Sequence, residues 1–193
     1  MTRGLALLFA ALTMLSGAGH AQAQGFDMRD IMDGRPSYLR GGGGGSGPIQ
    51  RNTVSYPANY APGTIVINTG ERRLYLVLSN GQALSYGIGV GRDGFRWSGT
   101  HRITAKKEWP SWTPPSQMLR RRPDLPRHMN GGVDNPLGAR AMYLGSTLYR
   151  IHGSNEPETI GQAVSSGCFR MTNEDVTDLY SRVSVGTPVI VKN

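Results

Sequence analysis

Cysteine is nearly absent from this sequence: one residue, Cys168, stands among 193. A single cysteine cannot form an internal disulfide, so Cys168 carries a free thiol that is either packed in a core or chemically active. Acidic residues are also scarce, with 13 Asp and Glu against 21 Lys and Arg, which gives a net charge of +8. This excess favours encounter with an anionic polymer, and it equally fits a solvated basic surface.

Histidine is scarce as well, and its spacing matters. His20 lies in the leader described below, and His101, His128 and His152 are not spaced like zinc ligands. The sequence also lacks the Gly-x-Ser-x-Gly elbow of serine hydrolases and any nucleic-acid recognition motif. We therefore expect no metal, no cofactor and no nucleic-acid partner.

Long apolar runs are missing outside the first residues. Residues 4–15 are mostly Leu, Ala, Phe and Met, follow a positive Arg3, and precede a small-x-small site at Ala21-Gln22-Ala23. This pattern predicts a cleaved signal peptide over residues 1–23, the alternative being a retained N-terminal anchor. We expect an exported, periplasmic protein with no stable membrane insertion after cleavage.

The glycine-rich stretch that follows predicts a flexible tether. Gly41–Gly45 and the following Ser-Gly-Pro cannot bury enough apolar surface to offset chain entropy, so residues 24–60 are interpreted as a linker. Residues 61–193 suffice for one compact domain with a core of its own.

The domain is predicted to be mainly β. Strand-like residue patterns occur in seven segments, and Asn80-Gly81 is a strong hairpin turn. Residues 109–126, with five prolines and two tryptophans, are expected to be irregular, and residues 156–163 to form a helical turn. The strands are expected at residues 64–68, 72–78, 83–90, 101–107, 139–144 and 147–152, with a last strand at 187–191.

One clear helix is predicted just after the cysteine. Thr172 is a suitable N-cap, and Val176, Leu179, Tyr180 and Val183 form an apolar face at helical spacing. Gly186 is expected to end this helix.

Cys168 and His152, sixteen residues apart, are the candidate catalytic pair. A neutral imidazole can take the thiol proton and later return it to a leaving amine. The backbone N–H groups of Gly167 and Cys168 are candidates for an oxyanion hole, and Arg170 adds positive charge that could hold a substrate carboxylate. The alternative is a buried cysteine beside Phe169 and a structural histidine; export, the preceding glycine and the following arginine favour chemistry.

Two segments carry a resemblance to a known family. His152-Gly153-Ser154-Asn155 and Ser166-Gly167-Cys168-Phe169-Arg170-Met171 are similar to the catalytic signature of L,D-transpeptidases of the YkuD type. The resemblance continues in the segments around them and spans about residues 64–191: Asn135-Pro136-Leu137-Gly138, Tyr143-Leu144-Gly145, residues 173–180 and Val185-Gly186-Thr187-Pro188-Val189.

The resemblance implies a barrel- or sandwich-like catalytic domain with Cys168 as nucleophile and His152 as proton donor and acceptor. It implies that the Gly153 carbonyl orients the imidazole. The implied reaction is acyl transfer on peptidoglycan stem peptides through a thioester, giving 3→3 crosslinks. Water as acceptor would make the protein a carboxypeptidase, and a lysine of an outer-membrane or periplasmic protein would make it an anchoring enzyme.

One departure and three competing interpretations accompany the resemblance. Many family members have a histidine where this chain has Ser166, which leaves the base function to His152. Sortases separate histidine and cysteine much further, and NlpC/P60 peptidases place the cysteine first. A catalytically silent wall-binding module is the alternative outside enzymes.

Overall fold

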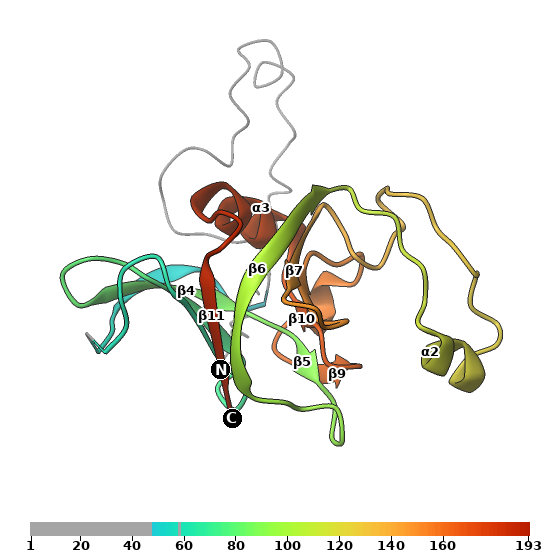
Figure 1. Ribbon diagram of the computed structural model, residues 1–193, viewed down its shortest axis with the longest axis horizontal. Coiled ribbons are helices and arrows are strands. Elements are labelled where there is room, and N and C mark those ends of the chain that lie inside the picture. Colours follow the sequence, from blue (N-terminus) through green and yellow to red (C-terminus); the bar gives the residue numbers. More distant parts are fainter. Residues whose placement is uncertain (1–47, 58) are drawn as a thin grey trace, which may run out of the picture. The chain divides into compact units, whose positions relative to one another are not determined.

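Strands dominate the computed structural model, which describes residues 48–57 and 59–193 (Figure 1). A two-stranded parallel sheet pairs β5 (Val90–Gly91) with β9 (Ala163–Ser165). The other described strands form one nine-stranded sheet in the order β1-β4-β3-β2-β11-β6-β7-β8-β10. Its members are β1 (Asn52–Ser55), β2 (Ile65–Asn68), β3 (Arg73–Val77), β4 (Gln82–Gly87), β6 (Gly99–Glu108), β7 (Arg140–Leu144), β8 (Arg150–His152), β10 (Phe169–Arg170) and β11 (Pro188–Lys192).

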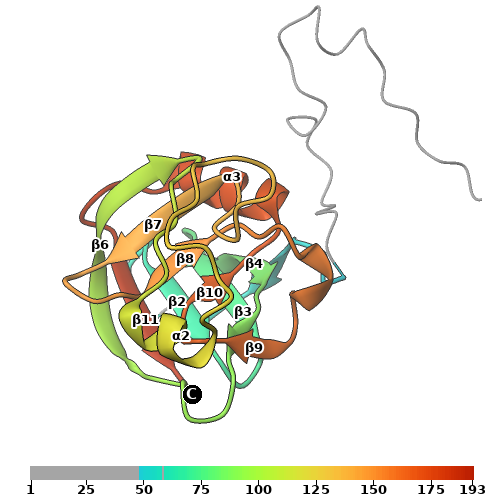
Figure 2. The same cartoon turned by 90° about the vertical axis from the view of Figure 1, so that its right-hand side faces the viewer.

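Most neighbouring strands of the large sheet are antiparallel, and two pairs are parallel: β2 with β11, and β8 with β10. In Figure 2 the strands curve around a common interior. The predicted mainly β, barrel- or sandwich-like architecture with one clear helix is confirmed. The β8–β10 pair matters for function because it joins the segment of His152 to that of Cys168.

The β2–β3–β4 meander follows the predicted pattern. Leu74 and Leu76 point into the core and are almost fully buried, while Tyr75 between them is half-buried. Asn80 and Gly81 both have positive φ, at 60° and 69°, as the two-residue hairpin turn requires. The expected strand over 83–90, however, stops at Gly87.

After Gly87 the chain stops pairing with β3 and pairs instead with the cysteine loop and the strand that follows it. Gly89 exchanges backbone hydrogen bonds with Arg170, each 2.9 Å, and β5 then pairs with β9. An alternating pattern cannot reveal this change of partner, because the apolar residues Ile88 and Val90 stay buried on either path. The predicted pairing with the preceding strand is therefore confirmed for residues 83–87 and wrong for residues 88–90.

Helix α3 (Asn173–Arg182) is the predicted helix. Thr172 caps it, accepting a hydrogen bond from the Asp175 N–H at 3.1 Å, and Val176 and Leu179 are fully buried. The helix ends at Arg182 rather than at Gly186, because Val183 already has extended backbone angles. None of the helices in the described residues has the length and apolar character needed to cross a membrane.

Two short helical segments flank the site. The helical turn expected in residues 156–163 is present as the 3₁₀ helix η2 (Pro157–Thr159). The segment from residue 109 to 126, expected to be wholly irregular, contains a six-residue helix, α2 (Ser116–Arg121). Figure 1 shows this excursion extending away from the strands between β6 and β7.

The predicted linker is in part structured. Residues 1–47, which include the predicted signal peptide and most of the tether, lie outside the described residues. Within the remainder, Asn52–Ser55 form β1, which pairs antiparallel with β4. Ile49 packs over Gly87 and Gly161, where an added Cβ would meet it at 2.5 and 2.8 Å. The sheet therefore begins before residue 61.

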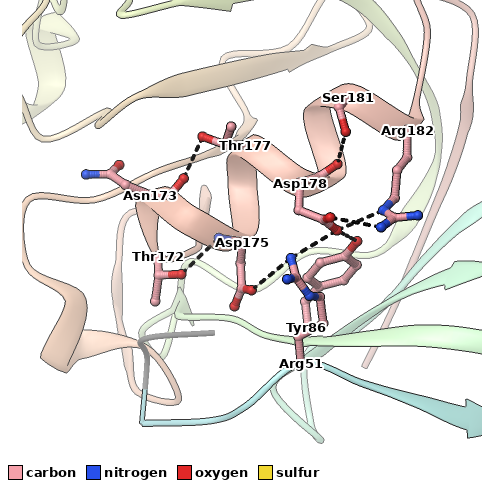
Figure 3. Close-up of polar contacts among 9 residues, drawn as sticks. All are labelled: Arg51, Tyr86, Thr172, Asn173, Asp175, Thr177, Asp178, Ser181 and Arg182. Atoms are coloured by element: carbon pink, nitrogen blue, oxygen red, sulfur yellow. Dashed lines mark hydrogen bonds and ion pairs between the residues drawn. The ribbon is translucent and has the colours of Figure 1, made fainter. Parts of the chain in front are cut away.

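Arg51, just before β1, contacts the acidic side chains of α3 (Figure 3). Its Nη1 lies 3.0 Å from Asp178 Oδ2 and 3.6 Å from Asp175 Oδ1. Asp178 also accepts hydrogen bonds from Tyr86 Oη and Arg182, which hold its pKa below the usual value despite burial. Asp175 is fully buried and accepts no hydrogen bond from the described residues, and burial raises its pKa to about 6.

Replacing Arg51 with glutamine is expected to destabilise the fold more at pH 7.5 than at pH 5. The raised pKa means that ionised Asp175 costs stability as pH rises through about 6, and this cost grows without Arg51. Leaving a buried carboxylate without its cation costs about 3 kcal/mol at pH 7.5, and much less once the group is protonated. Urea unfolding of Arg51→Gln at both pH values measures the difference.

The same substitution in an Asp175→Asn background provides the control. With no carboxylate to protonate at position 175, the loss caused by Arg51→Gln should be similar at both pH values. A pH-dependent loss that persists in this background would show that Arg51 does not act through Asp175.

Candidate active site

His152 is held in one orientation and one tautomer. It ends β8, is 4% exposed, and its Nδ1 lies 2.6 Å from the Gly153 carbonyl oxygen. A carbonyl oxygen can only accept, so Nδ1 carries the proton and donates it. In the neutral ring Nε2 then has the free lone pair, which is the arrangement required of a base.

Gly153 is itself fixed by contacts from two elements. Its N–H donates to Arg140 O at 3.0 Å. Its Cα faces Asn173 at the start of α3, whose Oδ1 accepts a hydrogen bond from the Ala139 N–H at 2.8 Å. A Cβ added at Gly153 would overlap Asn173 Oδ1, so glycine is required for this close approach. The predicted contact between His152 and the Gly153 carbonyl is therefore present, and Arg140 and Asn173 hold Gly153 in position.

Cys168 lies beside the β8 segment. The parallel pairing of β10 with β8 places Phe169 opposite Ile151 and Arg170 opposite His152. The Cys168 thiol is half-buried and its Sγ lies 3.8 Å from Leu148 O, just before β8. Cys168 and His152, sixteen residues apart in sequence, line the same cavity.

The loop before Cys168 is braced by side chains. Ser165 Oγ donates to Cys168 O at 2.7 Å, and Trp97 Nε1 donates to Gly167 O at 2.8 Å. Gly167 has φ of 108°, and a Cβ there would lie 2.5 Å from Tyr149 Cε1. These contacts fix the position of the thiol.

The Ser165 side chain also changes the prediction for the oxyanion hole. The Gly167 N–H, expected to form part of an oxyanion hole, instead donates to Ser165 Oγ at 3.1 Å. The Cys168 N–H has no acceptor among the described residues, so it stays available to a ligand. Sequence could not separate the two, because the outcome depends on where the Ser165 hydroxyl points.

Electrostatics keep the pair neutral at rest. Burial, reinforced by Arg170 and Arg150, lowers the pKa of His152 to about 3. Burial raises the pKa of the Cys168 thiol, although Arg150 and Arg170 act in the opposite direction. The resting state of the cavity therefore has a protonated thiol and a neutral imidazole, rather than a preformed thiolate–imidazolium pair.

Alkylation of Cys168 by iodoacetamide is therefore expected to accelerate throughout the range from pH 7 to pH 9. The thiolate fraction of a group with a raised pKa grows about tenfold per pH unit in this range, so the rate should rise about a hundredfold. Mass spectrometry of samples quenched at set times measures the alkylation rate. A rate that is already maximal and flat from pH 5 to 7 would indicate a preformed ion pair and contradict this assignment.

The cavity over the pair has a volume of about 940 Å³. One wall comes from the excursion after β6, including Trp112, Met118 and Leu125. Five arginines line the cavity, against two acidic residues, Asp134 and Glu156; the arginines are Arg92, Arg121, Arg122, Arg150 and Arg170. The cavity is thus suited to an extended ligand that carries negative charge.

The two arginines nearest the thiol differ in their partners. Arg170, predicted to hold a substrate carboxylate, is paired with Glu156 at 2.9 Å. Arg150 has no ion pair among the described residues, and it is not one of the site residues predicted from the sequence. Alternation along a strand could have found it, because residues 150 and 152 share a face.

Among the described residues, no three His, Cys, Asp or Glu side chains are grouped so that they could hold a metal ion.

Known proteins are similar to this chain in sequence and in fold. The model of the L,D-transpeptidase catalytic domain, YkuD, matches residues 62–191. The probable L,D-transpeptidase YbiS of Escherichia coli is 40% identical over 134 residues, covering 65% of this chain and 43% of YbiS. The chain thus spans less than half the length of this relative.

Two solved structures extend the comparison. L,D-transpeptidase 3 of Mycobacterium tuberculosis has a TM-score of 0.55 at 16% identity, over 67% of this chain and 60% of the other, which supports the fold. A Brucella melitensis protein described as a probable carnitine operon oxidoreductase is 47% identical, with a TM-score of 0.51, over 75% of this chain and 94% of the other.

Proposed function

The chain belongs to the L,D-transpeptidase (YkuD) family, and from this we propose that it is a cysteine acyltransferase that crosslinks peptidoglycan stem peptides. The observation that carries the proposal is the short contact between His152 Nδ1 and Gly153 O. It leaves Nε2 unprotonated in a cavity that also contains the Cys168 thiol.

In the acylation step Cys168 attacks the carbonyl carbon of the third stem residue, which is linked to a terminal D-amino acid. His152 Nε2 accepts the thiol proton as the S–C bond forms. The Cys168 N–H stabilises the oxyanion of the tetrahedral intermediate. The C–N bond then breaks, His152 returns the proton to the leaving amine, and a thioester remains on Cys168.

In the second step the side-chain amine of another stem attacks the thioester. His152 takes a proton from this amine, the C–S bond breaks, and the departing sulfur regains a proton. The product is a 3→3 amide crosslink. Stem peptides carry free carboxylates, which suits a cavity lined by more arginines than acids.

Localisation and domain limits form part of the same proposal. Residues 1–23 would act as a signal peptide, and residues 24–60 as a tether whose end, from Asn52 to Ser55, joins the sheet. Residues 61–193 would be the catalytic domain, working in the periplasm on wall peptides.

Product analysis tests the proposal. The protein is incubated with a disaccharide-tetrapeptide and the products are followed by mass spectrometry, with Cys168→Ala as control. A 3→3 dimer formed only by the wild type supports transpeptidation. A tripeptide alone would assign carboxypeptidase activity, and transfer to a lysine-containing acceptor protein would assign anchoring. Binding to sacculi by both proteins without any product would favour a wall-binding module.

A further inference from the structure

Arg150 occupies a position beside the thiol that the two-residue mechanism leaves without a role. It is the first residue of β8, and strand alternation places it on the face that also presents His152. Both side chains line the cavity that contains Cys168.

A shared hydrogen-bond acceptor joins Arg150 to the nucleophile. The carbonyl oxygen of Leu148 lies 3.2 Å from Arg150 Nη1 and 3.8 Å from Cys168 Sγ. Because both groups contact one oxygen atom, Arg150 Nη1 and Cys168 Sγ lie within about 7 Å of each other.

The charge of Arg150 is not neutralised. Its Nε is buried and has no hydrogen-bond acceptor among the described residues, and no carboxylate there pairs with it. The guanidinium carbon lies 5.1 Å from the Tyr143 ring centroid, a contact that holds the side chain but adds no negative charge. By contrast, the neighbouring Arg170 is paired with Glu156. A buried donor without an acceptor suggests that its partner arises during the reaction.

We propose that Arg150 is a further catalytic residue, whose guanidinium stabilises negative charge on the Cys168 sulfur when the thiol proton leaves. The inference rests on the proposed role of Cys168 as nucleophile and requires no particular acyl acceptor. The same charge is restored on sulfur when the thioester C–S bond breaks, so Arg150 acts in both half-reactions.

The need for such a group follows from the neutral resting pair. His152 is buried and resists protonation, so the imidazole alone provides little driving force for thiolate formation. A fixed cation next to sulfur favours the thiolate instead. Besides Cys168, the charged and titratable groups that line the cavity are Tyr149 just before β8, Arg150 and His152 on β8, Arg170 on β10, Arg92, Arg121, Arg122, Asp134 and Glu156.

The test measures the rate of Cys168 alkylation by iodoacetamide against pH in the full-length protein, without substrate. Arg150→Gln should shift the whole rate profile to higher pH by about one pH unit, so that alkylation at pH 8 is about tenfold slower. Arg150→Met, which keeps an apolar stem against Tyr143, should give the same displacement. Arg150→Lys keeps the charge and should restore most of the rate.

Arg120→Gln provides the matched control, because Arg120 is an exposed residue of α2 that does not line the cavity. It removes the same charge from the protein and should leave the alkylation profile unchanged. Profiles of Arg150→Gln and Arg150→Met that superimpose on the wild type would overturn the role of Arg150, whatever the protein does to stem peptides. A displaced profile in a protein that forms no acyl product would support Arg150 and overturn the proposed function instead.

Discussion

Replacing His152 with glutamine should reduce turnover of a disaccharide-tetrapeptide about a thousandfold, the effect typical of removing a general acid–base group. Glutamine can still donate a hydrogen bond to the Gly153 carbonyl, so the local fold should persist. It cannot accept the thiol proton or return it to the leaving amine. Because this chain has Ser166 where many relatives have a second histidine, no other imidazole in the cysteine loop can replace His152.

Initial rates from product chromatography measure this effect, with the thermal unfolding midpoint recorded for the same preparations. We expect midpoints within a few degrees of each other. Turnover of the variant within tenfold of the wild type would show that the base lies elsewhere. A parallel loss of turnover and of folding would make the substitution uninformative, and His152→Asn would then serve as the second variant, with the same expected loss.

Replacing Gly153 with alanine should lower both stability and turnover. The new methyl group would overlap Asn173 Oδ1, which holds the Ala139 N–H, and would approach Ala139 N at 3.0 Å and Val176 Cγ1 at 3.2 Å. Overpacking of this kind costs about 2–3 kcal/mol. Because the Gly153 carbonyl orients His152, a shift of about 1 Å should reduce turnover about a hundredfold.

Gly132→Ala is the matched control for this substitution, since nothing lies within 4 Å of a Cβ at Gly132. It should leave both the urea midpoint and turnover close to those of the wild type. Wild-type turnover in Gly153→Ala would mean that the carbonyl of residue 153 does not need to be held in place.

Much of the fold could be predicted because the periodic pattern of buried residues within a strand or helix is visible in that segment alone. Leu74 and Leu76 alternate with Tyr75, and Val176 and Leu179 repeat at helical spacing, so the strand and the helix follow directly. Asn80-Gly81 fixes the hairpin because both residues tolerate positive φ. These features need no knowledge of distant parts of the chain.

Strand partners and side-chain hydrogen bonds could not be predicted in this way. The change of strand partner after Gly87 depends on backbone groups of Arg170, more than eighty residues away. Arg51 stands in a segment whose composition predicts a linker, yet its charge is needed by Asp175 on α3. The local sequence around Arg51 gives no indication of Asp175, and the sequence around Asp175 gives none of Arg51.

The candidate site divides along the same line. The sequence identified the cysteine, the histidine and the glycine after it, because their residue types and offset carry the chemistry. It assigned an oxyanion donor to Gly167, which Ser165 already engages, and a carboxylate-binding role to Arg170, which Glu156 already pairs. It missed Arg150, whose importance depends on the position of the Leu148 carbonyl.

The protonation states of His152 and Cys168 also affect how reactive the resting protein should be. With His152 neutral and Cys168 protonated, the resting thiol should resist oxidation and alkylation at neutral pH better than a thiolate would.

The intact mass of the protein after brief exposure to a disaccharide-tetrapeptide tests the central claim most directly. If Cys168 forms the acyl-enzyme, the wild type gains the mass of the donor less its terminal D-amino acid, and peptide mapping places the adduct on Cys168. Cys168→Ala gains nothing. An unmodified wild-type protein, in a preparation whose thiol still reacts with iodoacetamide and which nevertheless consumes the donor, would contradict covalent catalysis by Cys168.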